Sequence, residues 1–445
     1  MSVNPQTTPQ TFDIKTFGCK VNTYDTGLLQ QRLQASGFLQ PSQEAQVHIL
    51  NTCAVTHEAT KEAIRQAKRL RKKNPNCTIV LTGCSAQVDG VHLDELEAVD
   101  LVVANSHKGQ LEEILKSYFS GTNAQKVHRS NIFRNESLGE GGGIESRHTR
   151  SFLKIQDGCN SFCTFCIIPF ARGKSRSLAI SDLVSAVQKL HDEGVNEVVL
   201  TGVHIGDYRD GEKVLEDLIE ALLQKTQMSR LRLSSLEPIE LSERLFDLFK
   251  DSRLCPHFHM SVQSAQSKVL SEMKRQYTAE KVEWAFNEIQ NRVPGAFVGM
   301  DVIVGFPGES ETDFAETYER LQKTPWTRIH VFPYSERQGT RAALSSEVVP
   351  VVERRRRSQL LRELSFERYS LRAADQIGSL KKVLVLREAR STETSVGLSR
   401  DYWNVQLPKV SDEFFGKELA VRITGADTQN GEEGVLFAEV VHGMA

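Results

Sequence analysis

Three cysteines stand close together at Cys159, Cys163 and Cys166, directly after an apolar, strand-like run. Thiolates are soft ligands that suit iron, and a cubane iron–sulfur cluster has several irons to hold. Three ligands from one loop leave one iron open. An open iron can chelate the amino and carboxylate groups of S-adenosylmethionine and pass an electron to its sulfonium. The spacing therefore predicts an iron–sulfur cluster with one open iron.

The alternatives to such a cluster are a zinc site and a set of plain surface thiols. A closed zinc site would need a fourth Cys or His nearby. His148 and His191 are the histidines that folding would have to bring in, and both lie far along the chain from the cysteines. Zinc therefore explains the pattern less well than an iron–sulfur cluster does.

A second set of cysteines lies upstream, at Cys19, Cys53 and Cys84. Each follows an apolar run typical of a strand, and the turns at the carboxyl ends of parallel strands meet at one edge of a sheet. The three thiols are therefore expected to converge around a second cluster. The alternative is three separate buried cysteines, which is common for this residue type. Cys77 and Cys255 fit neither set and are expected to be structural.

The elements that must position these cysteines are predicted from apolar patterns. Strand-like runs at 12–17, 47–51 and 78–82 alternate with helical patterns at 23–36 and 58–73, which favours a parallel α/β layer. Six further strand-like runs favour a mostly parallel partial (β/α) barrel with its site at the carboxyl ends of the strands. They span 151–155, 197–201, 230–234, 257–262, 297–304 and 328–333.

Short alternating strands near the C-terminus indicate a small all-β barrel, at 381–387, 403–408, 418–424 and 435–441. The predicted fold class is therefore α/β with a C-terminal all-β barrel. We expect an N-terminal parallel α/β domain at 11–125, a linker at 126–148, a central domain at 149–370 and the barrel at 371–445. A chain of 445 residues exceeds the usual length of a single core, which agrees with several domains.

Composition describes an ordinary globular protein, with 39% hydrophobic and 25% charged residues and a net charge of −2. No apolar stretch is long enough to span a bilayer, and the first residues lack the pattern of a secretory signal. We therefore expect no membrane partner and a cytoplasmic location. In that reducing setting, clustered thiols more often bind metal or do chemistry than form disulfides.

The Cys-x3-Cys-x2-Cys motif with an aromatic residue at Phe165 resembles the signature of the radical S-adenosylmethionine superfamily. The resemblance implies that Phe165 lies against the adenine of S-adenosylmethionine. It also implies further contacts at later strand ends: with the amino group, with the ribose and carboxylate, and on the adenine side. Thr201 and Gly202 are implied for the amino group, and Asp301 and Ile303 for the adenine side. The residues implied for the ribose and carboxylate are Ser234, Ser235 and Glu237.

The arrangement of two cysteine sets resembles the methylthiotransferases, in which a small barrel termed TRAM follows the radical domain. The segment from Cys19 to Asn22 resembles the subgroup that acts on N6-threonylcarbamoyladenosine beside the anticodon of tRNA. The stretch from Phe332 to Thr340 also matches, although Glu336, Arg337 and Gln338 stand where a second proline is common. Isopentenyladenosine tRNA or a ribosomal protein is the alternative substrate. An RNA-binding iron–sulfur protein without catalysis is the alternative of another class.

The resemblance implies two 4Fe-4S clusters and S-adenosylmethionine as cofactors. The cluster on Cys159, Cys163 and Cys166 would donate the electron that generates a 5′-deoxyadenosyl radical, which can attack an unactivated aromatic C–H bond. The cluster on Cys19, Cys53 and Cys84 would hold the sulfur or methylthio group, and a second S-adenosylmethionine would supply the methyl group. The partners implied are the tRNA anticodon arm, a flavodoxin- or ferredoxin-type electron donor and a sulfur source, with the enzyme as a monomer.

Contact with RNA must come from local basic patches, because the net charge is small. Two groups are expected to meet phosphates: the basic end of the helix at 58–73 and the stretch after the cysteine loop. The residues are Lys68, Arg69, Arg71, Lys72, Arg172, Lys174 and Arg176. The run 354–357 is either a solvated helix face or a further RNA contact. Tyr402 and Trp403 either sit in the barrel core, which we favour, or stack on a base. His204 is the histidine expected near S-adenosylmethionine.

Overall fold

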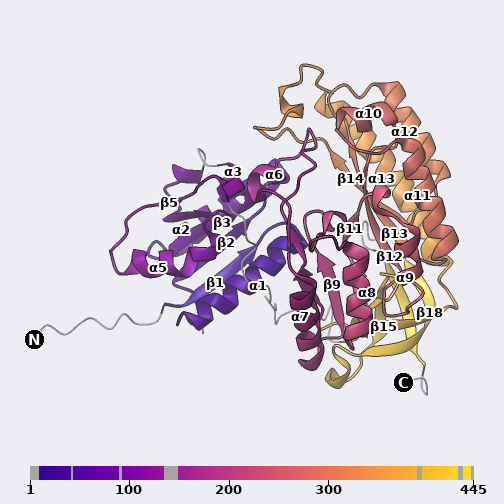
Figure 1. The fold of residues 1–445 in the computed structure, drawn as a ribbon, viewed down its shortest axis with the longest axis horizontal. Helices are drawn as coiled ribbons and strands as arrows, with labels where there is room; N and C mark the ends of the chain where they lie inside the picture. Colours follow the sequence, from indigo (N-terminus) through magenta and orange to yellow (C-terminus); the bar gives the residue numbers. More distant parts are fainter. Residues whose placement is uncertain are drawn as a thin grey trace, which may run out of the picture. The chain divides into compact units, whose positions relative to one another are not determined.

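The computed structural model describes residues 10–41, 44–89, 93–134, 149–387, 393–428 and 434–441 (Figure 1). The chain forms two compact units, each with its own core. The first consists of Met1–Ser146, Phe152–Asn160 and Cys166–Arg176, and the second of Arg147–Ser151, Ser161–Phe165 and Ser177–Ala445. The cysteine loop therefore leaves the first unit at Ser161 and returns to it at Cys166.

The first unit is built on a five-stranded sheet in the order β1-β2-β3-β4-β5, with every strand parallel to its neighbours. The strands are β1 (Phe12–Thr16), β2 (Val47–Thr52), β3 (Thr78–Gly83), β4 (Leu101–Ala104) and β5 (Val127–His128). The helices are α1 (Lys20–Ala35), α2 (His57–Lys73), α3 (Cys84–Val88), α5 (Leu111–Phe119) and α6 (Ile168–Arg172), with single 3-10 turns η1 (Lys108–Gln110) and η2 (Ile132–Arg134). The predicted parallel α/β layer is confirmed.

Helices cover both faces of this sheet, because alternate residues of each strand point to opposite sides. On one face Ile49 and Val80 pack with Leu29 and Leu33 of α1 and with Leu115 of α5. On the other face the strand residues pack against the small residues of α2, which let this helix lie close to the sheet; the set includes Leu50, Ile79, Leu81, Ala63 and Ala67. The basic side of α2 is thereby left on the surface.

One boundary of the first unit differs from the sequence-based expectation. Strand β5 pairs with β4, so the sheet continues into the stretch from 126 that we expected to begin the linker. The two residues of β5 are too short a run to show an alternating apolar pattern. Residues 135–148 of the expected linker lie outside the described residues.

The second unit contains a series of parallel strands, as the predicted fold class of the central region requires. One sheet pairs β9 (Glu197–Thr201) with β10 (Arg230–Leu233), and another has the order β11 (Ser235–Leu236), β12 (His257–Gln263), β13 (Phe297–Val304) and β14 (Arg328–Pro333). A parallel bridge between Leu231 and Leu254 continues the series from β10 towards β12. The remaining strands of the cysteine region are β6 (Ser151–Lys154), β7 (Gln156–Asp157) and β8 (Arg176–Ser177).

Helices and short turns connect these strands. The helices are α7 (Ile180–Asp192), α8 (Leu215–Lys225), α9 (Glu243–Leu248), α10 (Ser267–Glu272), α11 (Ala279–Arg292), α12 (Glu311–Lys323) and the long α13 (Val351–Ala374). Helix α12 begins with a capping box, in which the Ser310 hydroxyl accepts from the Asp313 amide and the Asp313 carboxylate accepts from the Ser310 amide. The alternation of strand and helix is what keeps the strands parallel, since each crossover returns the chain to the same end of the sheet.

The second unit ends in a closed barrel of five strands in the order β15-β16-β17-β19-β18. Its strands are β15 (Leu380–Val385), β16 (Thr394–Ser399), β17 (Asn404–Pro408), β18 (Glu418–Asp427) and β19 (Val435–Val440). The predicted barrel is confirmed, and β16 is an additional strand that sequence analysis missed. Trp403 is buried in the barrel core as predicted, while the ring of Tyr402 stacks on His257 with centroids 3.9 Å apart.

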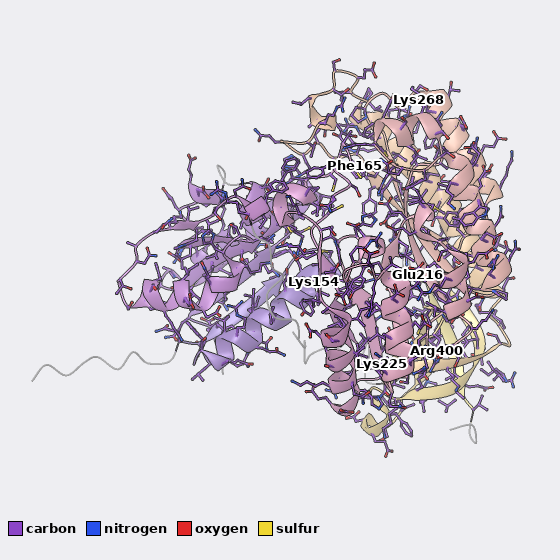
Figure 2. The ribbon with its side chains drawn as sticks, in the orientation of Figure 1. Lys154, Phe165, Glu216, Lys225, Lys268 and Arg400 are labelled. Carbon is purple, nitrogen blue, oxygen red and sulfur yellow. The ribbon has the colours of Figure 1, made fainter. Side chains whose placement is uncertain are left out.

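A buried ion cluster joins the barrel to the parallel strands within the second unit. Glu197 accepts hydrogen bonds from Arg230 and Arg232, and all three side chains are inaccessible to solvent. Arg230 also pairs with Glu418 of β18 at 2.7 Å, and Arg232 donates to the carbonyl of Arg400, a barrel residue labelled in Figure 2. The barrel is thereby attached through charged hydrogen bonds as well as apolar contacts.

Among the described residues, no helix has both the length and the apolar character that crossing a membrane would require.

Candidate functional site

Cys19, Cys53 and Cys84 follow three neighbouring parallel strands at the same level of the sheet. Thr16 of β1 is in register with Asn51 of β2, and Thr52 of β2 is in register with Gly83 of β3. Cys19 stands at the N-cap of α1, Cys53 follows β2, and Cys84 is the first residue of α3. The predicted convergence of these three turns on one sheet edge is confirmed.

Two glycines allow these turns to pack closely. Gly18 has a φ of +92°, and a Cβ there would lie 2.5 Å from the Cβ and 2.6 Å from the sulfur of Cys53. Gly83, with a φ of +96°, lies so close to β2 that a Cβ would be 2.4 Å from the Thr52 carbonyl oxygen. Only glycine is free of strain at such left-handed positions. Gly18 and Gly83 thus allow the turns of Cys19 and Cys84 to pack closely against the middle strand and turn, which carry Thr52 and Cys53.

The thiol of Cys53, in the middle turn, is affected by its surroundings. Burial, with a smaller contribution from the neighbouring thiols of Cys84 and Cys19, raises the pKa of Cys53 to about 12. Without a bound cation, this group therefore stays protonated at neutral pH. Bound metal reverses that situation, because a coordinating thiol is deprotonated outright.

Hydrogen-bond donors point at two of the sulfurs. The Asn105 side-chain amide donates to the sulfur of Cys84 at 3.6 Å, and the Val55 backbone N–H donates to the sulfur of Cys53 at 3.5 Å. Donors of this kind stabilise thiolate character and adjust the potential of iron–sulfur clusters. Among the described residues, no three His, Cys, Asp or Glu side chains converge as ligands of a single metal ion. In a cubane cluster each thiol binds a different iron, so the three sulfurs need not meet at one ion. Three cysteines at one sheet edge therefore fit a cluster.

The second cysteine triad lies in the loop between β7 and α6. Gly158, with a φ of +75°, packs against the backbone of Lys174, and the Cys159 amide donates to the Gly173 carbonyl at 3.1 Å. The loop is therefore closed at its base. Cys159 and Cys166 are partly exposed and Cys163 is buried, and none of the eight cysteines is in a disulfide. Cys77 and Cys255 are buried, as their expected structural role requires.

The residues implied for the amino, ribose and carboxylate groups of S-adenosylmethionine lie at strand ends of the second unit. Thr201 ends β9 and Gly202 follows it, while Ser234 lies between β10 and β11. The Ser234 amide donates to the Leu200 carbonyl at 3.0 Å. Its hydroxyl is buried and has no hydrogen-bond partner among the described residues. A buried hydroxyl without a partner costs stability unless a ligand supplies one, so this position fits a polar ligand.

The residues implied for the adenine share an apolar cluster. Phe165 and Ile303 both pack on the group formed by Val269, Met273, Phe306, Tyr334 and Ala342. The guanidinium of Arg275 lies 5.7 Å from the Phe165 ring centroid; Phe165 is labelled in Figure 2. Asp301 pairs with His259 at 3.0 Å, and Ser235 lies in β11. A flat apolar surface bordered by charge suits an aromatic base.

His204 lies beside the cysteine loop within the second unit. Its Nδ1 is 3.4 Å from the Ser161 hydroxyl, and its Nε2 is in close contact with the carboxylate of Glu240 and 3.6 Å from that of Glu237. Glu237 also forms an ion pair with Arg275. Sequence analysis singled out His204 and Glu237 but missed Glu240 and Arg275, because nothing in their local sequence marks them as neighbours of the loop.

The structure changes the expected roles of several basic residues. Arg172 is buried, and its guanidinium already bonds to Asp157, Asp25 and Asn22, so its geometry does not support a phosphate contact. Arg71 also has partners within the protein. It pairs with Asp100 and donates to the carbonyls of Pro75 and Cys77, which follow α2. Arg176 is partly buried and donates to the Arg172 carbonyl. Arg71, Arg172 and Arg176 therefore make contacts within the protein.

The other predicted RNA contacts are on the surface. Lys68 and Lys72 are exposed on α2 and form no ion pair among the described residues, while Arg69 lies 3.9 Å from Glu62. Lys174 is exposed after the cysteine loop. In the run 354–357, Arg354 and Arg357 are buried, and the acidic residues paired with Arg354, Arg356 and Arg357 are Glu309, Glu311, Glu336 and Glu353. Arg354 and Arg357 therefore fit neither alternative that the sequence left open, because they are buried and ion-paired within the fold.

Comparison with known proteins identifies families and relatives of this chain. Residues 153–321 match the Radical SAM superfamily, and residues 11–104 match a family described as Uncharacterized protein family UPF0004. The threonylcarbamoyladenosine tRNA methylthiotransferase MtaB of Aquifex aeolicus is 38% identical over 396 residues, which is 87% of this chain and 96% of the relative. The tRNA-2-methylthio-N(6)-dimethylallyladenosine synthase of Thermodesulfovibrio yellowstonii is 32% identical over 342 residues. The matched region covers 74% of this chain and 77% of that relative.

Among solved structures, the radical S-adenosylmethionine methyltransferase TsrM of Kitasatospora setae superposes with a TM-score of 0.56 at 14% identity, covering 76% of this chain and 77% of that protein. This likeness supports the fold. The relative from Aquifex aeolicus matches at 38% identity over nearly its whole length. This chain therefore belongs to the radical S-adenosylmethionine tRNA methylthiotransferase family.

Proposed function

We propose that this protein attaches a methylthio group to N6-threonylcarbamoyladenosine beside the anticodon of tRNA. The observation that carries the proposal is the pair of cysteine triads, with one triad gathered at the carboxyl edge of the β1-β2-β3 sheet and the other in a single loop. The names of relatives at 32–38% identity support the choice of substrate. The enzyme would use 4Fe-4S clusters and S-adenosylmethionine.

The donor sets define which residues would hold these groups. Cys159, Cys163 and Cys166 would ligate one cluster, and a second would be held by the N-terminal triad, Cys19, Cys53 and Cys84. When bound, the clusters and S-adenosylmethionine would supply a carbon radical, a sulfur atom and a methyl group.

The chain itself would orient these groups and exclude water. Phe165 and Ile303 would contact the adenine within their shared apolar cluster, and the nearby Arg275 guanidinium would help to hold the Phe165 ring. The buried Ser234 hydroxyl, which has no hydrogen-bond partner among the described residues, would donate a hydrogen bond to the ligand. The remaining residues of this proposed site are Thr201, Gly202, Ser235, Glu237 and Asp301.

The finer assignments form part of the same proposal. The sheet from β1 to β5 would belong to the cluster-bearing domain, and the regions 149–370 and 371–445 would be the radical and TRAM-like domains. RNA would be contacted by the exposed cations Lys68, Arg69, Lys72 and Lys174. The protein would work in the cytoplasm as a monomer, with a flavodoxin- or ferredoxin-type electron donor and a separate sulfur source.

The second candidate substrate is isopentenyladenosine in tRNA. It is favoured by the 32% identity to the dimethylallyladenosine synthase of Thermodesulfovibrio yellowstonii. Identity to the threonylcarbamoyladenosine enzyme of Aquifex aeolicus is higher, at 38%, over a larger share of this chain. We therefore place threonylcarbamoyladenosine first.

Mass spectrometry of tRNA nucleosides, with and without the gene, tests the proposal. We expect 2-methylthio-N6-threonylcarbamoyladenosine to vanish from the deletion strain and its unthiolated precursor to accumulate. The wild-type gene should restore the product, whereas Cys159→Ala and Cys53→Ala variants should not. Loss of the methylthio derivative of isopentenyladenosine instead would establish the second candidate, and unchanged nucleosides would reject both.

A further inference from the structure

A network of buried ion pairs lies within the first unit, beside the N-terminal cysteine triad. Lys154, labelled in Figure 2, bonds to Asp25 at 2.7 Å and to Asp157 at 3.0 Å. Arg172 bonds to Asp157 at 2.9 Å and to Asp25 at 3.2 Å. Lys108 bonds to Asp25 at 3.0 Å. The network joins α1, η1, β6, β7 and α6, which are elements that flank both cysteine sets.

The charges in this network do not balance. Among the described residues, the ion pairs connect three cations with two carboxylates, so one positive charge is in excess. The side chains of Arg172 and Lys154 are 3% and 9% exposed, and that of Lys108 is 13% exposed. Buried charges in proteins are paired with an opposite charge or with a metal site. The excess therefore calls for an anionic neighbour.

The cysteine triad is that neighbour. Cys84 packs with Ala171, the residue before Arg172, in one buried cluster, and the Asn105 side-chain amide donates both to the Cys84 sulfur at 3.6 Å and to the Ala171 carbonyl at 2.9 Å. Although burial lowers the pKa of Arg172, the charges of Asp157, Cys84, Asp25 and Cys19 together raise it. Cys84 also acts on Lys108, whose pKa is lowered overall by burial. A cubane core held by three thiolates carries net negative charge, and that charge is a determinant of its reduction potential.

Arg172 is also connected to the turns that carry the cysteines. Its Nη2 donates to the Asn22 side-chain oxygen at 2.6 Å. The Asn22 side-chain nitrogen donates to the carbonyls of Phe17 at 2.8 Å and Thr52 at 3.0 Å. Thr52 directly precedes Cys53, and Phe17 lies two residues before Cys19. One hydrogen-bonded chain thus runs from the guanidinium to two of the three turns.

We infer that Arg172 is a positioning residue for a cluster on Cys19, Cys53 and Cys84: it places a buried positive charge beside the cluster, fixes two of its turns through Asn22, and thereby raises its reduction potential. This inference rests on the proposed function, because it requires that these thiols hold a cluster. A cation stabilises the reduced cluster more than the oxidised one, since reduction adds negative charge. Removing the cation should therefore make the cluster harder to reduce.

The substitution Arg172→Met is suited to this test. It leaves two lysines facing two carboxylates, so the remaining network is neutral and every remaining charge keeps a partner. Arg172→Lys keeps the charge but not the forked geometry. Arg32→Met is the matched control, because Arg32 pairs with Glu112 near the far end of α1, about 20 Å along that helix from Cys19.

The experiment uses the full-length chain with Cys159, Cys163 and Cys166 all changed to Ala, so that only the N-terminal cluster remains. Iron content and potentiometric titration, followed by the electron paramagnetic resonance signal of the reduced cluster, are measured after anaerobic reconstitution. We expect about four irons per chain throughout. The potential should be lower in Arg172→Met than in the parent, close to the parent in Arg172→Lys, and unchanged in Arg32→Met.

Equal potentials in Arg172→Met and the parent, at equal iron content, would overturn the inference and leave the proposed function intact. Absence of iron from the parent itself would instead reject the N-terminal cluster. If Arg172→Met fails to hold iron, Lys108→Met provides the second measurement, because it removes the other cation that the Cys84 thiol influences. A potential that Lys108→Met leaves unchanged would then count against the inference.

Discussion

The Arg172 guanidinium donates a hydrogen bond of 2.6 Å to the side-chain oxygen of Asn22, across 150 positions of sequence. Sequence analysis assigned these residues to different tasks, with Arg172 as an RNA contact and Asn22 as part of a substrate-specific motif. The structure brings them into one buried network. The motif around Cys19 therefore has a structural reason to contain an amide at position 22, independent of the substrate.

Replacing Asn22 with Ala should weaken the N-terminal cluster site. The change removes two donors to backbone carbonyls and the acceptor for Arg172, and each buried group left without a partner costs about 1–3 kcal/mol. In the background that lacks the three loop cysteines, iron per chain after reconstitution should fall below that of the parent. Gln87→Ala is a control, because its amide also bonds two backbone groups, those of Ser106 and Ser130. Equal iron in both variants would contradict the role of Asn22.

Ser234→Ala should weaken the binding of S-adenosylmethionine. The hydroxyl is buried without a partner among the described residues, so it is available to the ligand. Loss of one such hydrogen bond, worth about 0.5–1.5 kcal/mol, corresponds to an increase in Kd of roughly 2- to 13-fold. Isothermal titration of the reconstituted enzyme measures it. Ser358→Ala, which removes another buried hydroxyl without a partner but on α13, should leave the Kd unchanged; an unchanged Kd in both variants would exclude the contact.

Changing Lys68 and Lys72 together to Ala should reduce tRNA affinity and its dependence on salt. Both ammonium groups are exposed and form no ion pair among the described residues. Each lost phosphate contact should lower the slope of log K against log salt by about 0.7–0.9. Lys73→Ala is the matched control, because Lys73 is paired with Glu44 at 2.7 Å. If the double variant kept the wild-type slope, α2 would not lie against RNA.

Glu197→Gln should destabilise the second unit in a pH-dependent way. Although burial opposes ionisation, Arg232 and Arg230 hold the pKa of Glu197 well below its usual value. A carboxylate with a depressed pKa contributes stability above its unfolded pKa, near 4.3, and loses it as the pH falls through the folded value. Breaking such a buried pair costs about 3–5 kcal/mol.

Urea unfolding at several pH values measures this contribution. The difference between wild type and Glu197→Gln should be constant from pH 6 to 8 and shrink only below about pH 4. Glu220→Gln removes an exposed partner of Arg244 and should have an effect of at most about 1 kcal/mol. If Glu197→Gln had the same urea midpoint of unfolding as wild type at neutral pH, the ion cluster would contribute no net stability.

Much of the fold was predictable because its signals are local. Strands β9, β13 and β14 have the predicted bounds, since β9 and β13 are mainly apolar runs and β14 alternates polar with apolar residues from Arg328 to Val331. The N-terminal triad was predictable from topology, because three parallel strands must bring their following residues to one edge. Strand β16 was missed because three of its six residues are Thr or Ser and because it contains Gly397, whose close packing against Val383 and Leu384 is visible only in the barrel.

The sequence by itself determined the chemistry of this protein: two sets of three thiols, the strands that precede them, and the family whose motifs they match. Only the tertiary structure decided which charges are buried and paired with one another. Lys154 and Asp25 are separated by 129 positions, and no local pattern distinguishes a lysine that will be buried against a carboxylate from one that will face solvent. The reason is physical: periodicity records which face of an element is buried, whereas the pairing of charges depends on how separate elements pack.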